Sequence, residues 1–123
     1  MNFEQTSEFK KELKSLSKRI PTIQLDVKRV YSKLEALYVD TTEYDIKEYR
    51  KQFFDSKNAV ILSGSNEATD IIKMRLHTET VQFRQKLRIV LIAKKEGNNI
   101  LLLEVFSKSD KNREDKLRIE KYL

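Results

Sequence analysis

Two helical apolar stripes lie on either side of the only proline, Pro21, and they constrain the fold more than any other feature. The apolar residues recur at alternating spacings of three and four, which is typical of amphipathic helices. They are Phe9, Leu13, Leu16 and Ile20 before the proline, and Ile23, Val27, Val30, Leu34 and Leu37 after it. Proline is tolerated in a first helical turn, so we expect two helices joined by a tight turn. Each helix has one apolar face, and the pair therefore needs a third layer, for which a sheet is the obvious candidate.

The segments around this hairpin have weaker patterns. Residues Asn2 to Thr6 predict a short strand, and Ser7 is a good cap for the helix that follows. Residues 40–58 contain aromatic and apolar side chains at helical spacing, from which we predict a short third helix. Residues 59–62 form a brief apolar run that ends in the turn-like sequence Ser63-Gly64-Ser65-Asn66.

The last part of the chain changes to the two-residue period of strands. In Asp70 to Leu76 the side chains of Ile72, Met74 and Leu76 share one face, while Lys73 and Arg75 share the other. Two further runs rich in Ile, Val and Leu, at residues 86–93 and 100–107, flank the turn signal Glu96-Gly97-Asn98-Asn99. We therefore predict three strands after the helices.

A final helix closes the predicted order of elements. Asp110 can cap a helix over residues 114–123, whose apolar contacts would come from Leu117, Ile119, Tyr122 and Leu123. The prediction is one α+β domain over residues 1–123, with an N-terminal strand and a helical hairpin packed on a small antiparallel sheet and a C-terminal helix.

Composition excludes several classes of site. The chain has 123 residues, no cysteine, one histidine and two glycines. Disulfides, thiolate nucleophiles, cysteine–zinc sites, histidine clusters and glycine-rich phosphate loops are thereby excluded, and we expect no metal and no cofactor. No apolar stretch is long enough to cross a membrane and no apolar signal core follows Met1, so we expect a cytoplasmic protein with no membrane partner.

The positive charge is concentrated in the second half. Residues 1–69 carry 12 basic and 11 acidic residues, whereas residues 70–123 carry 13 and 8. Lys73 and Arg75 must line a surface or a cleft, because a strand points them the same way and both are costly to bury unpaired. Together with cations from the next strand and the following turn, they can hold one phosphate. These further cations are Arg88, Lys108, Lys111 and Arg113. The alternative is a solvated basic face with ordinary salt bridges, for example to Glu104.

Several short motifs, in this order of elements, resemble the RelE/ParE toxin superfamily of bacterial toxin–antitoxin systems. The resemblance covers most of the chain. The segments that carry it are Phe9-Lys10-Lys11-Glu12-Leu13, Ile72-Lys73-Met74-Arg75-Leu76, Leu87-Arg88-Ile89-Val90-Leu91-Ile92 and Leu103-Glu104-Val105-Phe106-Ser107-Lys108.

The resemblance implies a compact toxin whose antiparallel sheet presents a basic concave face. Members of the RelE branch are ribosome-dependent mRNA endoribonucleases, and family members have a cognate antitoxin as partner. The pair Lys73-x-Arg75 is similar to the family's basic pair on the second strand, and Arg88 is similar to its arginine on the next strand. Residues 40–58 and 77–85 are longer than compact members require, so we interpret them as insertions.

If the chain is a metal-independent nuclease of this kind, each of its basic residues has a separate role in RNA cleavage. Cleavage needs an activated 2′-hydroxyl, a stabilised phosphorane and a protonated 5′-oxygen. The hypothesis makes Lys73 the general base, Arg75 and Arg88 the clamps on the transition state, and Tyr122 a proton donor or a stacking ring. Lys108, Lys111 and Arg113 would contact RNA phosphates. A further candidate acid or base is His77, for which an inert surface position is the main alternative.

Two other functions remain open from the sequence. The chain can be a ParE-like inhibitor of DNA gyrase, or a non-enzymatic module that binds nucleic acid or protein through its basic face. Its aromatic side chains can stack on bases, although their helical spacing favours packing contacts. These are Tyr31, Tyr38, Tyr44, Tyr49, Phe53 and Phe54.

Overall fold

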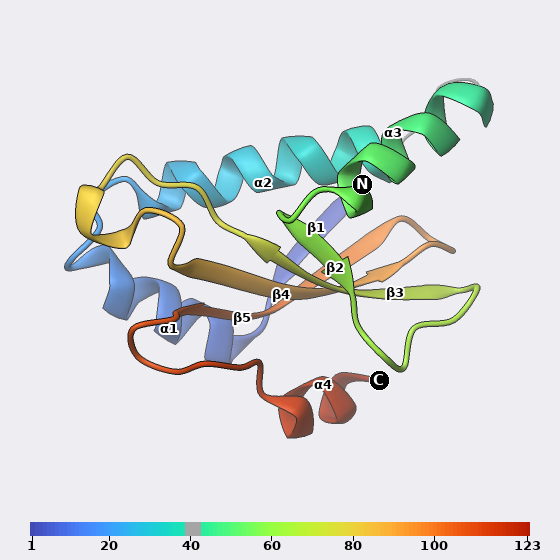
Figure 1. Ribbon diagram of the computed structural model, residues 1–123. Coiled ribbons are helices and arrows are strands. Elements are labelled where there is room, and N and C mark those ends of the chain that lie inside the picture. Colours follow the sequence, from blue (N-terminus) through green and yellow to red (C-terminus); the bar gives the residue numbers. More distant parts are fainter. Residues whose placement is uncertain (39–42) are drawn as a thin grey trace.

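The computed structural model contains one five-stranded sheet and four α-helices among the residues it describes (Figure 1). It describes the backbone of residues 1–38 and 43–123, and the side chains of 1–38 and 48–123. The predicted insertion at 40–58 therefore lies partly outside the described residues. The elements in chain order are β1 (Asn2–Gln5), α1 (Ser7–Ser17), α2 (Ile23–Tyr38), α3 (Glu43–Asp55), β2 (Ala59–Ile61), β3 (Thr69–Arg75), the 3-10 turn η1 (Val81–Phe83), β4 (Leu87–Lys94), β5 (Asn99–Ser107) and α4 (Lys116–Tyr122).

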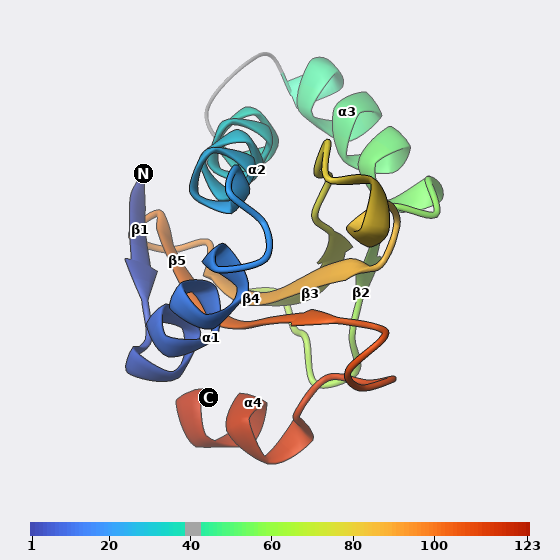
Figure 2. The same ribbon diagram turned by 90° about the vertical axis from the view of Figure 1, so that its left-hand side faces the viewer.

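The predicted α+β architecture is confirmed. The strands lie in the order β1-β5-β4-β3-β2, and α1, α2 and α3 cover one face while α4 lies on the other (Figure 2). All neighbouring strands are antiparallel except β1, which pairs parallel to β5. The sheet is thus mixed rather than purely antiparallel, because the connection from β1 to the rest of the sheet passes through the helices. None of the described helices is both long and apolar enough to cross a membrane.

The two predicted stripes form the contact between the helices and the sheet. Phe9, Ile20 and Ile23 have no exposed surface, and the other stripe residues are buried with them. All of them except Leu37 form one apolar cluster with the inward residues of β3, β4 and β5. The helix cap is Thr6 rather than Ser7, since the Thr6 hydroxyl accepts a hydrogen bond from the Phe9 amide at 3.1 Å.

The opposite face of the sheet is only partly covered. A second apolar cluster forms where α4 lies on it and includes Ile71, Val90, Ile92 and Ile119. A bulge in β5 follows the pairing of Val90 with Glu104 and lengthens that strand by one residue.

Helix α4 is shorter than predicted. It begins at Lys116 and is capped by Asp115, whose carboxylate accepts from the Arg118 amide at 3.1 Å, so the prediction of Asp110 as the cap was wrong. Of its predicted apolar contacts, Ile119 is buried, but Leu117 and Leu123 are exposed. A helix of two turns offers only one narrow stripe to the sheet, and Ile119 occupies it.

Strand β2 was not predicted, so four strands rather than three follow the helices. It is an edge strand of three residues that pairs antiparallel with β3. Val60 and Ile61 are both exposed, whereas Ala59 is buried. The run therefore lacks the alternation of apolar and polar residues by which a half-buried strand is recognised.

Helix α3 contacts the sheet through an ion pair with the buried carboxylate of Asp70, near the start of β3. Its Oδ2 accepts hydrogen bonds from the Tyr38 hydroxyl at 2.6 Å and from Arg50 on α3 at 3.0 Å. Lys95 lies 3.5 Å from the other carboxylate oxygen. Because one carboxylate contacts groups from α2, from α3 and from the turn after β4, it fixes the position of α3 over the sheet edge.

We therefore expect Asp70→Asn to destabilise the protein. The substitution removes a buried charge and leaves Arg50 with a weaker partner, at a cost of about 2 kcal/mol in the free energy of unfolding. Urea unfolding measures this change. The matched control is Asp110→Asn, whose ion pair with Arg19 is about half exposed and contributes less than about 0.5 kcal/mol. Equal effects of the two substitutions would contradict the role of Asp70.

Candidate functional site

The register of β3 and β4 brings the predicted cations onto one face. Arg75 pairs directly opposite Arg88, and Lys73 pairs opposite Val90. Side chains of directly paired residues point to the same face of a sheet, so all three basic side chains project from the side on which α4 lies. The sequence predicted that Lys73, Arg75 and Arg88 would gather on one face, and the register has that arrangement.

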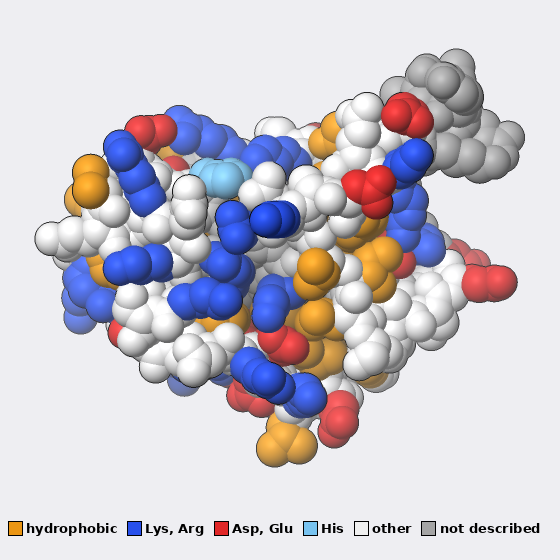
Figure 3. Space-filling model, in the orientation of Figure 1, with side chains coloured by type: hydrophobic (Ala, Val, Ile, Leu, Met, Phe, Trp, Pro, Cys, Tyr) orange, Lys and Arg blue, Asp and Glu red, His pale blue; other side chains and the backbone are white. Residues whose placement is uncertain are grey.

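These side chains line a hollow of about 200 Å³, which we call the basic pocket. Its cations are Lys57, Lys73, Arg75, Arg88 and Lys108, and no acidic residue lines it. Figure 3 shows basic side chains gathered on the side of the molecule where strand β2 lies in Figure 1. The basic pocket lies beside the part of the sheet that α4 covers, and it opens to solvent.

Arg88 is the most buried cation of the basic pocket, with only 8% of its surface exposed. Its Nη1 donates hydrogen bonds to the carbonyl oxygens of Gln85 at 2.8 Å and of Leu87 at 3.0 Å. Burial and then the charge of Arg75 lower the pKa of Arg88, but a guanidinium stays protonated at physiological pH. Neither arginine forms an ion pair within the part of the chain that the structure describes.

Two arginines in this arrangement favour an anion. Burying a charge without a partner costs free energy, and like charges directly opposite on neighbouring strands repel each other. A phosphate placed between the guanidinium groups would offset both costs, because each fork can donate two hydrogen bonds to its oxygens. The chemistry that the basic pocket can perform is therefore the binding and charge stabilisation of a phosphate.

Lys73 lies in the basic pocket but has a partner of its own. Its Nζ donates to Glu114 Oε2 at 2.9 Å, and both side chains are largely buried. Burial by itself would raise the pKa of Glu114, but the hydrogen bond and charge of Lys73 lower it overall. Glu114 is thus ionised, and among the three cations that β3 and β4 contribute to the basic pocket only Lys73 has a carboxylate partner within the described residues.

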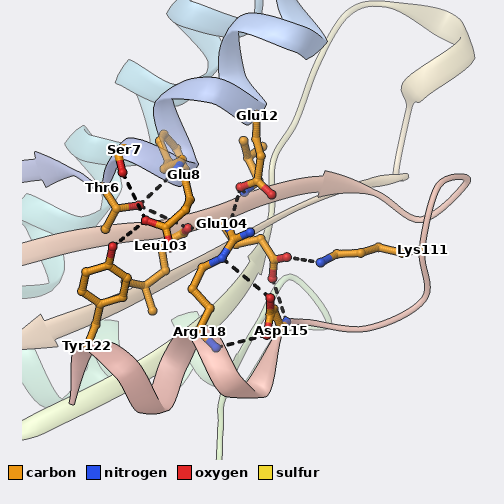
Figure 4. Close-up of polar contacts among 12 residues, drawn as sticks. Thr6, Ser7, Glu8, Glu12, Leu103, Glu104, Lys111, Asp115, Arg118 and Tyr122 are labelled. Atoms are coloured by element: carbon orange, nitrogen blue, oxygen red, sulfur yellow. Dashed lines mark hydrogen bonds and ion pairs between the residues drawn. The ribbon is translucent and has the colours of Figure 1, made fainter.

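The remaining predicted site residues lie apart from the basic pocket, with the exception of Lys108. Lys111 is paired with the buried Glu104, and the Tyr122 hydroxyl donates to Glu8 on α1 at 2.5 Å (Figure 4). Arg113 is exposed in the loop before α4. Lys111 and Tyr122 hold the loop and α4 in place, so the structure does not bring them to the two arginines.

The network that contains these residues also closes the edge of β5. Glu12 on α1 accepts from the Val105 amide at 3.3 Å and from Arg118 Nη1 at 2.8 Å. Arg118 in turn donates to the Leu103 carbonyl at 2.9 Å (Figure 4). These side chains satisfy backbone groups that β1 is too short to reach, which protects an otherwise open edge.

Comparison with known proteins shows the fold. No protein-family model matches the chain, and no curated protein matches its sequence. A structural match is a chain in the crystal structure of the archaeal RelE–RelB complex from Pyrococcus horikoshii OT3. The TM-score is 0.50 at 15% sequence identity, over 87% of this chain and 93% of that one. This chain has a RelE-like fold.

Within the RelE-like fold, two basic residues near the site were missed from the sequence. Lys57 precedes the unpredicted strand β2 and reaches the basic pocket because β2 pairs with β3. Lys33 is on α2 and lines a neighbouring hollow together with His77 and Arg75. No local pattern marks either lysine, since each approaches the arginines only through long-range packing. No group of three or more potential metal-ligating side chains is present in the described part of the chain.

His77 follows β3 and lies near the cations. Burial lowers its pKa from the ordinary value, and the charges of Lys33 and Arg75 lower it further. Because a lower pKa favours the uncharged form, the imidazole is neutral at physiological pH. A neutral imidazole can accept or donate a hydrogen bond and can stack on another ring.

The titration of His77 tests this electrostatic arrangement. We expect its NMR titration midpoint below the ordinary histidine value in the unmodified protein. In Arg75→Gln the midpoint should rise, because a neighbouring positive charge is gone, but should stay below the ordinary value because burial remains. Lys10→Ala, an exposed lysine of α1, should leave the midpoint unchanged. A midpoint that does not respond to Arg75→Gln would contradict the proximity of the two side chains.

Proposed function

We propose that this protein is the toxin of a type II toxin–antitoxin pair and that it cleaves mRNA on the ribosome at the basic pocket. The observation that carries the proposal is the buried Arg88 directly opposite Arg75, with no carboxylate partner for either among the described residues. The RelE-like fold supports it by analogy, since fold alone does not determine activity.

The proposed reaction is transesterification within the RNA. The 2′-oxygen bonds to phosphorus while the bond from phosphorus to the 5′-oxygen breaks. The 2′-hydroxyl gives its proton to a solvent water, and the departing 5′-oxygen takes one from a protonated side chain, which solvent then reprotonates. Negative charge grows on the phosphoryl oxygens in the transition state. In the proposal Arg75 and Arg88 stabilise that charge, and hydrogen bonds to the carbonyl oxygens of Gln85 and Leu87 hold the Arg88 guanidinium before the substrate arrives.

Lys73 and Lys108 have supporting roles in the proposal. The hypothesis from the sequence made Lys73 the general base, and in the structure its Nζ acts as a hydrogen-bond donor to Glu114. We therefore propose that Lys73 donates a proton to the departing 5′-oxygen. Lys108 at the end of β5 would contact a phosphate as a point charge.

The proposed partner is a cognate antitoxin with an acidic segment. The structural match is named as a complex of RelE with RelB, and this chain has a net charge of +6 with the excess in residues 70–123. An acidic antitoxin segment would offset the repulsion between Arg75 and Arg88 in the absence of RNA. A small gene beside that of this protein would encode it.

Arg88→Gln tests the proposal most simply. We expect it to slow ribosome-dependent mRNA cleavage by about a hundred-fold or more, since one fixed donor to the transition state is lost. Primer extension in an in vitro translation reaction measures the cleavage, and relief of growth arrest in expressing cells is a second readout. Lys10→Ala, on an exposed site of α1, is the control and should cleave normally. Circular dichroism and urea unfolding of each variant separate loss of activity from loss of fold.

Three results would contradict the proposal. Full cleavage by Arg88→Gln would remove the basic pocket from the chemistry. Inhibition of DNA gyrase without RNA cleavage would favour a ParE-like toxin. Salt-dependent binding of RNA by the unmodified protein, with no cleavage in the presence of ribosomes, would favour a non-enzymatic binding module.

A further inference from the structure

A second hollow adjoins the basic pocket on the other side of the sheet edge. It has a volume of about 250 Å³ and lies between α3 and the end of β3, and we call it the aromatic pocket. It shares Asn58, Ala59, Met74 and Arg75 with the basic pocket. The two pockets therefore meet at Arg75, so that one ligand can occupy both.

The walls of the aromatic pocket come mainly from ring side chains. Tyr49 and Phe53 project from successive turns of α3, with ring centroids 6.2 Å apart and planes inclined by 38°. The Tyr49 hydroxyl donates to the Lys33 carbonyl oxygen at 3.3 Å, which fixes the ring against α2. Met74 and His77 complete the lining on the side of β3. The aromatic side chains were expected to be packing residues, and Phe53 does pack on the core, yet its ring also borders this open space.

The size and charge of the aromatic pocket limit the class of ligand that it can bind. Its volume is below the range of about 300 to 1,000 Å³ in which drug-sized ligands bind, so it suits a single flat ring system. Its charged lining residues, Lys33 and Arg75, are both positive. A flat ring attached to an anion fits both the rings and the charges, and a nucleotide has that chemistry.

We propose that the aromatic pocket binds the nucleobase next to the phosphate that Arg75 and Arg88 hold. This inference rests on the proposed function and adds a base-specific subsite to it. The base stacks on the ring of Tyr49 or His77. The polar side chains of Gln52, Ser56 and Asn58 also line the aromatic pocket and can form hydrogen bonds with the edge of the base.

The proposal gives a role to the segment that the sequence marked as an insertion. Tyr49, Phe53 and Asn58 all belong to it, and Arg50 fastens it to Asp70. A ring held on a fixed helix loses little conformational freedom when a base binds, so the position of α3 sets the strength of the contact. Cleavage preference at one position of the mRNA thus depends on α3, whereas cleavage itself depends on the basic pocket.

A titration of the isolated protein followed by NMR tests the subsite without the ribosome. The probes are the four nucleoside 5′-monophosphates and, as the base-free control, ribose 5-phosphate. We expect nucleotides at millimolar concentration to shift amide signals of residues 49–56 and of His77, which line only the aromatic pocket, as well as signals of the basic pocket. Ribose 5-phosphate should shift signals of the basic pocket alone. Identical shifts from both kinds of probe, or no shift of residues 49–56 by any nucleotide, would overturn the proposal.

Substitution of Tyr49 supplies the matched comparison. Tyr49→Leu should weaken binding of the preferred nucleotide about ten-fold and leave binding of ribose 5-phosphate unchanged. The control is Tyr31→Leu, because Tyr31 is an α2 ring stacked on Phe3 at 4.1 Å and outside both pockets. It should affect neither probe. An equal loss of nucleotide binding in both variants would overturn the proposal.

Cleavage mapping separates this inference from the proposed function. Tyr49→Leu should change the base preference at one position beside the cut, whereas Arg88→Gln should slow cleavage at every site. If Tyr49→Leu cleaves normally and its base preference is unchanged, the base subsite is overturned, but the proposed nuclease activity is not. No cleavage by the unmodified protein would overturn the nuclease, while the nucleotide titration would still decide whether the aromatic pocket binds a base.

Discussion

The register between β3 and β4 is the constraint on which both the core and the basic pocket depend. Seven consecutive residue pairs hold it, with Arg75 opposite Arg88 at one end. A slip of one residue would turn Ile72 and Met74 out of the main core and turn Lys73 and Arg75 into it. The burial of apolar side chains against α1 and α2 therefore fixes the cations on the opposite face. No contact between the cations is needed to bring them together, and their repulsion opposes it.

The two faces of the sheet are covered unequally, and this leaves room for a site. Three helices lie on one face, while α4 has only two turns and covers part of the other through Ile119. Hydrogen bonds from its side chains to Glu8 and Glu12 of α1 hold it over one end of the sheet. The end with Arg75 and Arg88 stays open to solvent. Two arginines that face each other at this end without a carboxylate partner among the described residues are the reason for proposing a bound anion there.

The sequence was informative wherever a local period decides the structure. The stripes around Pro21 and the alternation in β3 predicted the helical hairpin, the sheet and the common face of Lys73 and Arg75. Strand β2 was not predicted because its three residues are all apolar and so show no alternation of apolar and polar side chains. The hydrogen bond of Tyr122 to Glu8 could not be predicted either, since it depends on where α4 begins and on how α4 packs against α1. The roles of the cations in RNA cleavage stay a prediction.

The most direct test of the central claim, that Arg75 and Arg88 form a phosphate site, is urea unfolding in phosphate and in chloride at equal ionic strength. An anion that binds only the folded state raises the free energy of unfolding. The account predicts that phosphate stabilises the unmodified protein more than chloride does. It predicts that Arg75→Gln, which removes one of two repelling charges, is more stable in chloride but gains less from phosphate. An equal gain from phosphate in both proteins would contradict the account.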